Sequence, residues 1–134
     1  MAPIPRAQAE RTLRRLLANG RLTALPKRPA DQQTIAALAA ARFTGGRTYT
    51  EAEVNEVLSG WLATVSDPYG IDHVTLRRML VDLRLLVRTT TGSTYQLAAH
   101  DWLAALAGLA PAELLAEIDR SRSRRKRQHG GAGA

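Results

Sequence analysis

The sequence predicts a mainly α-helical protein with a small β-hairpin, and therefore an α+β fold. Three observations in residues 47–97 support this prediction. A short strand at residues 47–49 precedes two amphipathic helices, and two β-type runs then flank a polar turn that contains Gly92. This order predicts a winged helix-turn-helix-like core over residues 31–97, with extra N-terminal and C-terminal helices.

The segment before this core, residues 1–30, should form one helix and an extended connector. A helix over residues 8–19 would place four apolar side chains on one face, namely Ala9, Leu13, Leu16 and Leu17. Gly20 suits a left-handed C-cap after this helix. Because Pro26 and Pro29 follow without periodicity, we expect a connector that is anchored in the core by Leu22 and Leu25.

The core itself should begin with an alanine-rich helix that Asp31 caps and that ends before Gly45. Thr50 and Glu53 have the spacing of a capping box, so the next helix should start there. Its apolar stripe consists of Val54, Val57, Leu58, Trp61 and Leu62.

A second helix of the core should follow the break at Pro68 and Gly70, with Asp72 as its cap. Its buried stripe would be Leu76, Met79, Leu80 and Leu83. The hairpin comes next, and Tyr49 and Tyr95 are expected to pack on the core as strand side chains.

The C-terminal part divides into a helical extension, residues 98–119, and a basic tail, residues 120–134. His100 or Asp101 would cap a helix with apolar positions at Trp102, Leu103, Leu106 and Leu109. Pro111 suits the first turn of a further stretch that carries Leu114, Leu115 and Ile118. The tail has six cations within eight residues and then GGAGA, so we expect it to be disordered.

The net charge of +7 is unevenly distributed. Residues 1–47 hold nine cations and two acids, and residues 120–134 hold six cations and no acid. The intervening residues 48–119 hold four cations and ten acids. An acidic core therefore lies between basic ends, and any attraction to nucleic acid should come from those ends.

The composition excludes several classes of protein. The chain has no cysteine, which rules out disulfides and thiolate metal sites and is typical of the cytoplasm. We find neither a signal peptide nor an apolar run long enough to cross a membrane. His73, His100 and His129 are far apart, so neither a metal site nor a catalytic triad is indicated. We expect a non-enzymatic cytoplasmic protein without a cofactor or a membrane partner.

Four segments in this order resemble one bacterial family: LLANGRLTALPKRP, ARFTGGRTYTEAEVNEVL, VTLRRMLVDLRLLVR and TTGSTYQL. The family is an uncharacterised domain of unknown function, number twenty eighty-seven, and the resemblance covers residues 11–97. Its members occur alone or fused behind ArsR-type winged-helix regulators. The resemblance therefore implies a winged-helix-like domain with a role near transcription. The turn WLATVSDPYGIDH departs from the family, in which this turn is short and acidic.

Three groups of cations are candidate contacts for nucleic-acid phosphates. They are Arg14, Arg15, Lys27 and Arg28 near the N-terminus, Arg77 and Arg78 in the second core helix, and Arg120, Arg122, Arg124, Arg125, Lys126 and Arg127 in the tail. Each of the three groups also has an interpretation that involves no nucleic acid. Arg14 and Arg15 would meet the acidic cluster of residues 51–56. Arg77 or Arg78 would pair with the same cluster, and Arg78→Ala would then lower thermal stability. The tail, in turn, would serve only for solubility.

Two hypotheses for function follow. The first is a non-enzymatic, transcription-related DNA-binding protein that is held to phosphates mainly by its basic ends, with little sequence preference. The alternative is a protein-interaction or self-association module that uses the fold for packing alone. The acidic character of residues 48–119 favours this alternative, as do Val74 and Val81 on the outer side of the second core helix.

Overall fold

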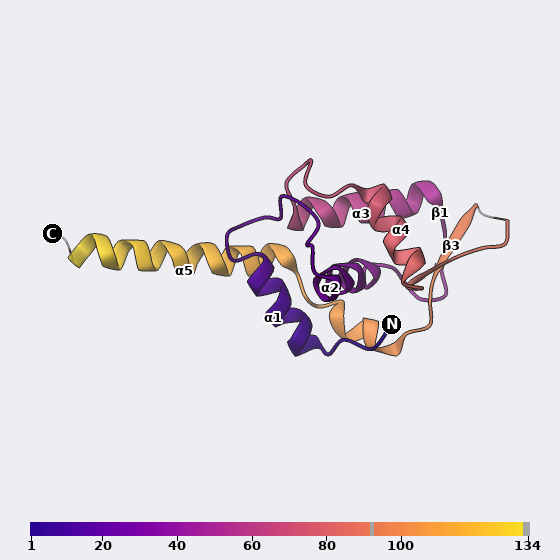
Figure 1. Ribbon diagram of the computed structural model, residues 1–134, viewed down its shortest axis with the longest axis horizontal. Coiled ribbons are helices and arrows are strands. Elements are labelled where there is room, and N and C mark those ends of the chain that lie inside the picture. Colours follow the sequence, from indigo (N-terminus) through magenta and orange to yellow (C-terminus); the bar gives the residue numbers. More distant parts are fainter. Residues whose placement is uncertain (92, 133–134) are drawn as a thin grey trace.

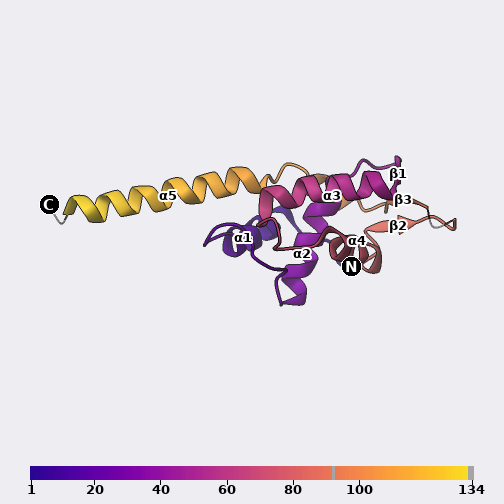
Figure 2. The ribbon, with the colours of Figure 1, turned by 90° about the horizontal axis from the view of Figure 1, so that it is seen from above.

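The computed structural model describes residues 1–91 and 93–132, which form a helical body and a long C-terminal helix that projects from it (Figure 1, Figure 2). The elements in chain order are α1 (Arg6–Leu16), α2 (Pro29–Ala40), β1 (Thr48–Thr50), α3 (Glu51–Val65), α4 (His73–Asp82), β2 (Leu86–Arg88), β3 (Thr94–Leu97), the 3₁₀ helix η1 (Asp101–Leu106) and α5 (Pro111–Ala132). The predicted α+β class is confirmed.

The sheet has three antiparallel strands in the order β1–β3–β2. The predicted hairpin is β2–β3, and β1 pairs with β3 so that Tyr49 lies opposite Tyr95. Both tyrosine side chains are buried, as predicted. The first strand is shifted by one residue from its predicted position. Gly92, the expected turn glycine, is not among the described residues.

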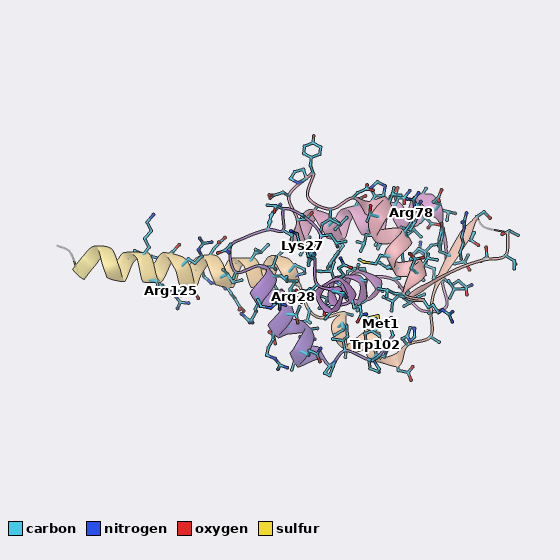
Figure 3. The ribbon with its side chains drawn as sticks, in the orientation of Figure 1. Met1, Lys27, Arg28, Arg78, Trp102 and Arg125 are labelled. Carbon is cyan, nitrogen blue, oxygen red and sulfur yellow. The ribbon has the colours of Figure 1, made fainter. Side chains whose placement is uncertain are left out.

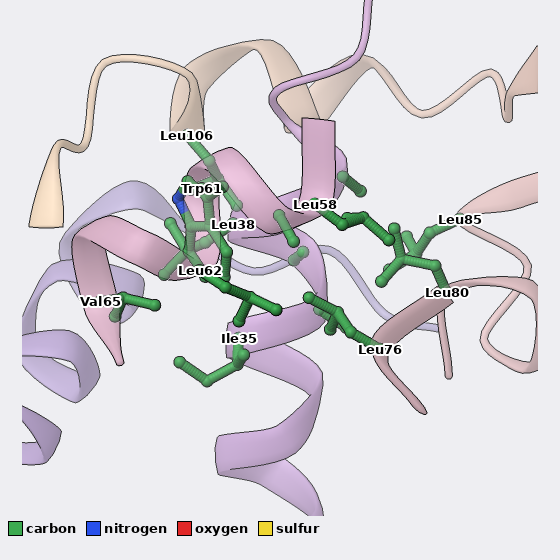
Figure 4. Packing of buried hydrophobic residues seen from close by; sticks show 14 of the residues in the cluster. Ile35, Leu38, Leu58, Trp61, Leu62, Val65, Leu76, Leu80, Leu85 and Leu106 are labelled. Atoms are coloured by element: carbon green, nitrogen blue, oxygen red, sulfur yellow. The ribbon is translucent and has the colours of Figure 1, made fainter. Parts of the chain in front are cut away.

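Helix α2 forms the centre of the core. Residues 34–40 are all buried, and the helix contacts α1, α4 and η1. Figure 4 shows Leu38 of α2 beside Trp61 and Leu62 of α3. The part of the helix that is covered on every side needs small residues for close approach, which explains the four buried alanines at positions 36, 37, 39 and 40.

Helix α3 begins where the capping box predicts. The Thr50 hydroxyl accepts from the Glu53 amide at 3.2 Å, and the Glu53 carboxylate accepts from the Thr50 amide at 3.0 Å. The hydrogen bond from the Thr50 amide, and next the one that Arg47 donates to the same carboxylate at 2.8 Å, lower the pKa of Glu53. The predicted stripe faces the core, with Val54, Leu58, Trp61 and Leu62 buried and Val57 partly buried.

Helix α4 also begins and packs as predicted. The Asp72 carboxylate accepts from the Thr75 amide at 3.2 Å and caps the helix. Burial raises the pKa of Asp72, but the bonds from the Thr75 and Val74 amides outweigh burial and the net direction is downward. Of the predicted stripe, Leu76 and Leu80 are fully buried, and Met79 and Leu83 are partly buried. Val81, which was expected on the outer side, also packs partly against the core.

The starts of α1 and α2 differ from the prediction. Helix α1 begins at Arg6, earlier than expected, and ends well before Gly20, although Gly20 does have a positive φ of 107°. Helix α2 begins at Pro29 instead of after an Asp31 cap. A proline needs no amide partner in the first turn and its φ is already helical, so it can start the helix. Asp31 lies inside that first turn.

The C-terminal region differs from the prediction more than α1 and α2 do. Residues 101–106 form a 3₁₀ helix rather than an α-helix, and neither His100 nor Asp101 caps it through its side chain. Helix α5 begins at Pro111 as predicted, but it continues to Ala132 where we expected disorder from residue 120. Arginine, lysine and glutamine favour helix, and cations near a helix C-terminus interact favourably with its dipole. The basic run therefore extends the helix.

The turn between α3 and α4 is held against the N-terminal connector. The Leu22 amide donates to the Val65 carbonyl, and the Asp67 amide donates to the Leu22 carbonyl, each at 2.9 Å. Gly70 packs directly on this connection, because a Cβ at that position would lie 2.8 Å from the Leu22 carbonyl oxygen. A Cβ at Gly60 in α3 would meet nothing within 4 Å.

Two glycine-to-alanine substitutions should therefore change stability in opposite directions. Gly60→Ala should raise the free energy of unfolding by about 0.5–1 kcal/mol, because glycine is the poorer helix former. Gly70→Ala should lower it by about 1–3 kcal/mol, because the Leu22 carbonyl must move. Urea denaturation of both variants measures the difference, and a more stable Gly70→Ala protein would contradict the close packing of the turn.

Candidate nucleic-acid interface

The basic segment of α5 is defined here as Arg120, Arg122, Arg124, Arg125, Lys126 and Arg127. It lies on the part of α5 that extends beyond the body (Figure 1), and all six side chains are exposed. Within the described residues, no carboxylate lies at ion-pair distance from any of them. Arg127 Nε donates to the Ser123 carbonyl oxygen at 3.4 Å. The segment therefore presents six charges that an external anion can neutralise.

The cations of the basic segment lie on two opposite sides of the helix. At about 100° per residue, one side carries Arg122, Arg125 and Lys126 and the other carries Arg120, Arg124 and Arg127. A helix with its side chains is about 10–12 Å across, and the major groove of B-DNA is about 12 Å wide. Cations on both sides of such a helix match the phosphates that line both walls of the groove.

Three arginines of the body hold η1 and α5 in place. Arg6 donates to the carbonyl of Ala105 in η1 at 3.0 Å, and Arg42 donates to a carbonyl just after η1. Arg14 pairs with Glu117 of α5 at 2.9 Å. The contacts of Arg6 and Arg42 were not predicted from the sequence. Their partners are 99 and 65 residues away, so no local pattern signals the contacts.

Arg14 and Arg15 are paired within the body, but not with the predicted partners. Arg14 lies between Glu117 and Glu10, and the hydrogen bond with Glu117 is the main cause of its raised pKa. Arg15 pairs with Asp31, whose side chain is buried. The hypothesis that both arginines meet the acidic cluster of residues 51–56 is wrong, because α1 packs on α2 and η1 rather than beside the start of α3.

Lys27, Arg28 and Arg78 are exposed, and none forms an ion pair with another described residue. They do not form one surface with the basic segment. Figure 3 shows Arg125 on the projecting helix, Lys27 and Arg28 near the middle of the molecule, and Arg78 towards the opposite end. The structure thus separates the predicted site residues along its long axis.

Arg77 is the arginine of α4 that pairs with the acidic cluster. It donates to Asn55 Oδ1 at 2.7 Å and lies 3.3 Å from the Glu51 carboxylate, and its side chain is only 16% exposed. Tyr95 also donates to this carboxylate, at 3.4 Å. The contacts join α4 to α3, so Arg77 is engaged within the body. The expectation of reduced stability applies to Arg77 and not to Arg78.

Alanine substitutions should distinguish these two neighbours. Arg77→Ala should lower the free energy of unfolding by about 1–2 kcal/mol, because Asn55 and Glu51 lose a partly buried donor. Arg78→Ala should change it by less than about 0.5 kcal/mol, because an exposed side chain is removed. Thermal unfolding of the two variants provides the comparison. Equal destabilisation would show that Arg78 also supports the packing of α4.

Metal sites and membrane-spanning helices are two further possibilities for the described residues. No group of three or more His, Asp or Glu side chains is placed to hold a metal ion in the part of the chain that the structure describes. Over the same residues, no helix is long and apolar enough to span a bilayer.

Fold and charge define an α+β protein with a helical extension that carries six exposed cations within eight residues. The chain belongs to the family described as "Uncharacterized protein conserved in bacteria (DUF2087)", whose model matches residues 21–97. The predicted resemblance is confirmed, with a start at residue 21 instead of 11. The match spans the connector and α2 to β3, and leaves out α1, η1 and α5. No curated protein and no solved structure matches the chain significantly.

Proposed function

We propose that this protein is a non-enzymatic, cytoplasmic nucleic-acid-associated protein that binds duplex DNA through the basic segment of α5. The observation that supports the proposal is the set of six exposed cations without a carboxylate partner on a projecting helix. Each cation that reaches a phosphate releases a condensed counterion, so six of them provide strong, salt-dependent attachment. This attachment needs no recognition of base sequence.

The body of the protein has a supporting role in this proposal. The order α2, β1, α3, α4, β2, β3 is compatible with a winged-helix-like arrangement, in which the second helix of the motif would read base edges. In α4, however, Arg77 is engaged with α3, and Val74 and Val81 offer no hydrogen bonds to bases. We therefore propose attachment through phosphates with little sequence preference. The transcription-related role rests on the family resemblance.

The test is a titration of duplex DNA with the full chain and with a chain that ends at Asp119, each at about 50 and about 200 mM salt. The full chain should bind more tightly at the lower salt concentration, and the shortened chain should lose most of this binding. Equal binding by the two chains would remove α5 from the interface and refute the proposal.

A protein-interaction or self-association module is the second candidate. Tyr69 stands on the α3–α4 turn with its side chain fully exposed, at 102%, and Val87 of β2 is 52% exposed. Exposed tyrosine is enriched among the residues that anchor protein interfaces. The turn that carries Tyr69 is also fixed by its contacts with Leu22, so little order would have to be gained on binding. Absence of duplex binding by the full chain at low salt would favour this candidate.

A further inference from the structure

We propose that the basic segment of α5 lies lengthwise in the major groove of B-form DNA, with cations on both of its sides in contact with both phosphate walls. This inference rests on the proposed function. It adds the groove that the segment occupies and the form of duplex that it prefers. The competing placement is a helix that lies across the outside of one strand and uses one side only.

The basic segment stands clear of the body. Ile118 is the last α5 side chain, among the described residues, that packs against the core. From Arg120 onward the helix extends away from the body in both views (Figure 1, Figure 2). The segment spans eight residues, which is about 12 Å of helix at 1.5 Å per residue. A groove can therefore receive this stretch without a collision with the body.

The charges of the segment lie on two opposite sides of the helix. The first side consists of Arg120, Arg124 and Arg127, and the second side of Arg122, Arg125 and Lys126. At about 100° per residue, the centres of the two sides are roughly 180° apart. A helix that lay across one strand would need cations on one side only. The major groove instead places a phosphate wall on each side of a helix about 10–12 Å across.

Short side chains separate the two cationic sides. Ser121 lies between them on one face of the helix, and Ser123 lies between them on the other. Because serine extends much less than arginine, the helix can approach the floor of a groove that is about 8.5 Å deep. A serine hydroxyl can bond to more than one kind of base edge, so this approach adds little sequence preference.

The acids just before the segment limit which part of α5 can enter the groove. Asp119 is exposed, directly precedes Arg120 and forms no ion pair with a described residue. Its carboxylate repels phosphates. Glu117, one turn earlier, is engaged by Arg14 of the body. The contacts with phosphates therefore begin at Arg120, and the acidic body stays outside the groove.

The shape of the groove predicts which duplex the segment prefers. The major groove of an A-form RNA duplex is deep and narrow, and side chains do not enter it. A cationic segment that only neutralises phosphates has no reason to favour DNA, since RNA carries the same backbone charge. With DNA and RNA duplexes of one sequence at about 50 mM salt, the full chain should bind the RNA at least about tenfold more weakly. Equal or tighter binding of RNA would overturn the groove placement.

Two matched variants test whether both sides of the helix contact DNA. One replaces the three cations of the first side by glutamine, and the other replaces those of the second side. Each loses three charges and keeps similar helix propensity, so circular dichroism should show unchanged helix content. Each should reduce the slope of log K against log salt concentration from about −5 to about −3. If one variant keeps the native slope and the other loses nearly all of it, only one side binds and the groove placement is wrong.

Methylation by dimethyl sulfate locates the segment on the DNA. Guanine N7 lies in the major groove and adenine N3 in the minor groove. At saturating full-length protein, methylation of guanine N7 should decrease while that of adenine N3 stays unchanged. The opposite pattern, or no protection of either atom, would overturn the groove placement and leave the proposed attachment to DNA intact. Absence of duplex binding by the full chain at low salt would overturn both.

Discussion

Replacement of the six cations of the basic segment by glutamine should remove most of the salt dependence of duplex binding. With six phosphate contacts, the slope of log K against log salt concentration should be about −5 for the native protein. Its affinity should then fall by about 10³-fold between about 50 and about 200 mM salt. The glutamine variant should bind weakly, and almost equally, at both concentrations. Fluorescence anisotropy with a labelled duplex measures the slope.

Glutamine is chosen because it keeps the helix while it removes the charge. Its helix propensity is close to that of arginine and lysine, so circular dichroism should show an unchanged helix content. The control replaces Lys27, Arg28 and Arg78, three exposed cations of the body that form no ion pair with a described residue, by glutamine. The control should keep a slope near that of the native protein. If the control loses the slope and the α5 variant keeps it, the body and not the basic segment is the interface.

The parts of the fold that the sequence predicts well are those determined by neighbours along the chain. The capping box of Thr50 and Glu53 and the Asp72 cap act within one helical turn, so their residue types and spacing are sufficient. The start of α2 was missed although its signal is equally local. Pro29 has a helical φ and needs no amide partner, so it starts the helix, and Asp31 lies in the first turn, where it pairs with Arg15.

Composition revealed where the cations of the candidate interface lie, but not which of them are neutralised. Arg14 and Arg77 have carboxylate partners on distant elements, at Glu117 and Glu51, and such pairs depend on packing that no local pattern encodes. The helical state of the basic segment was missed for another reason. Like charges oppose helix formation, but here the helix is already started and anchored by Leu114 and can be extended residue by residue.

The indole of Trp61 shows the same limit. The apolar stripe of α3 predicts that Trp61 is buried, and its burial is confirmed. Whether the indole nitrogen finds an acceptor depends on segments that are distant in the sequence, and among the described residues it finds none.

Substitution of Leu106 by alanine should destabilise the protein as strongly as a substitution within the matched segment. Leu106 of η1 is fully buried and lies near Leu38 and Trp61 (Figure 4). Removal of a buried leucine side chain costs about 2–5 kcal/mol, through lost transfer energy and the cavity left behind. Leu58→Ala in α3, also fully buried, should cost a similar amount. Both variants should melt roughly 10–20 °C below the native protein.

The control is Leu115→Ala in α5, which removes a side chain that is only partly buried. It should cost about 1 kcal/mol, because less apolar surface is returned to water. If Leu106→Ala costs no more than this control, the C-terminal extension is an appendage that the core does not need. If Leu106→Ala matches Leu58→Ala, residues 21–97 alone lack part of their core. Helix α5 is then rigidly attached through η1, and its direction from the body is set by the same packing that stabilises the fold.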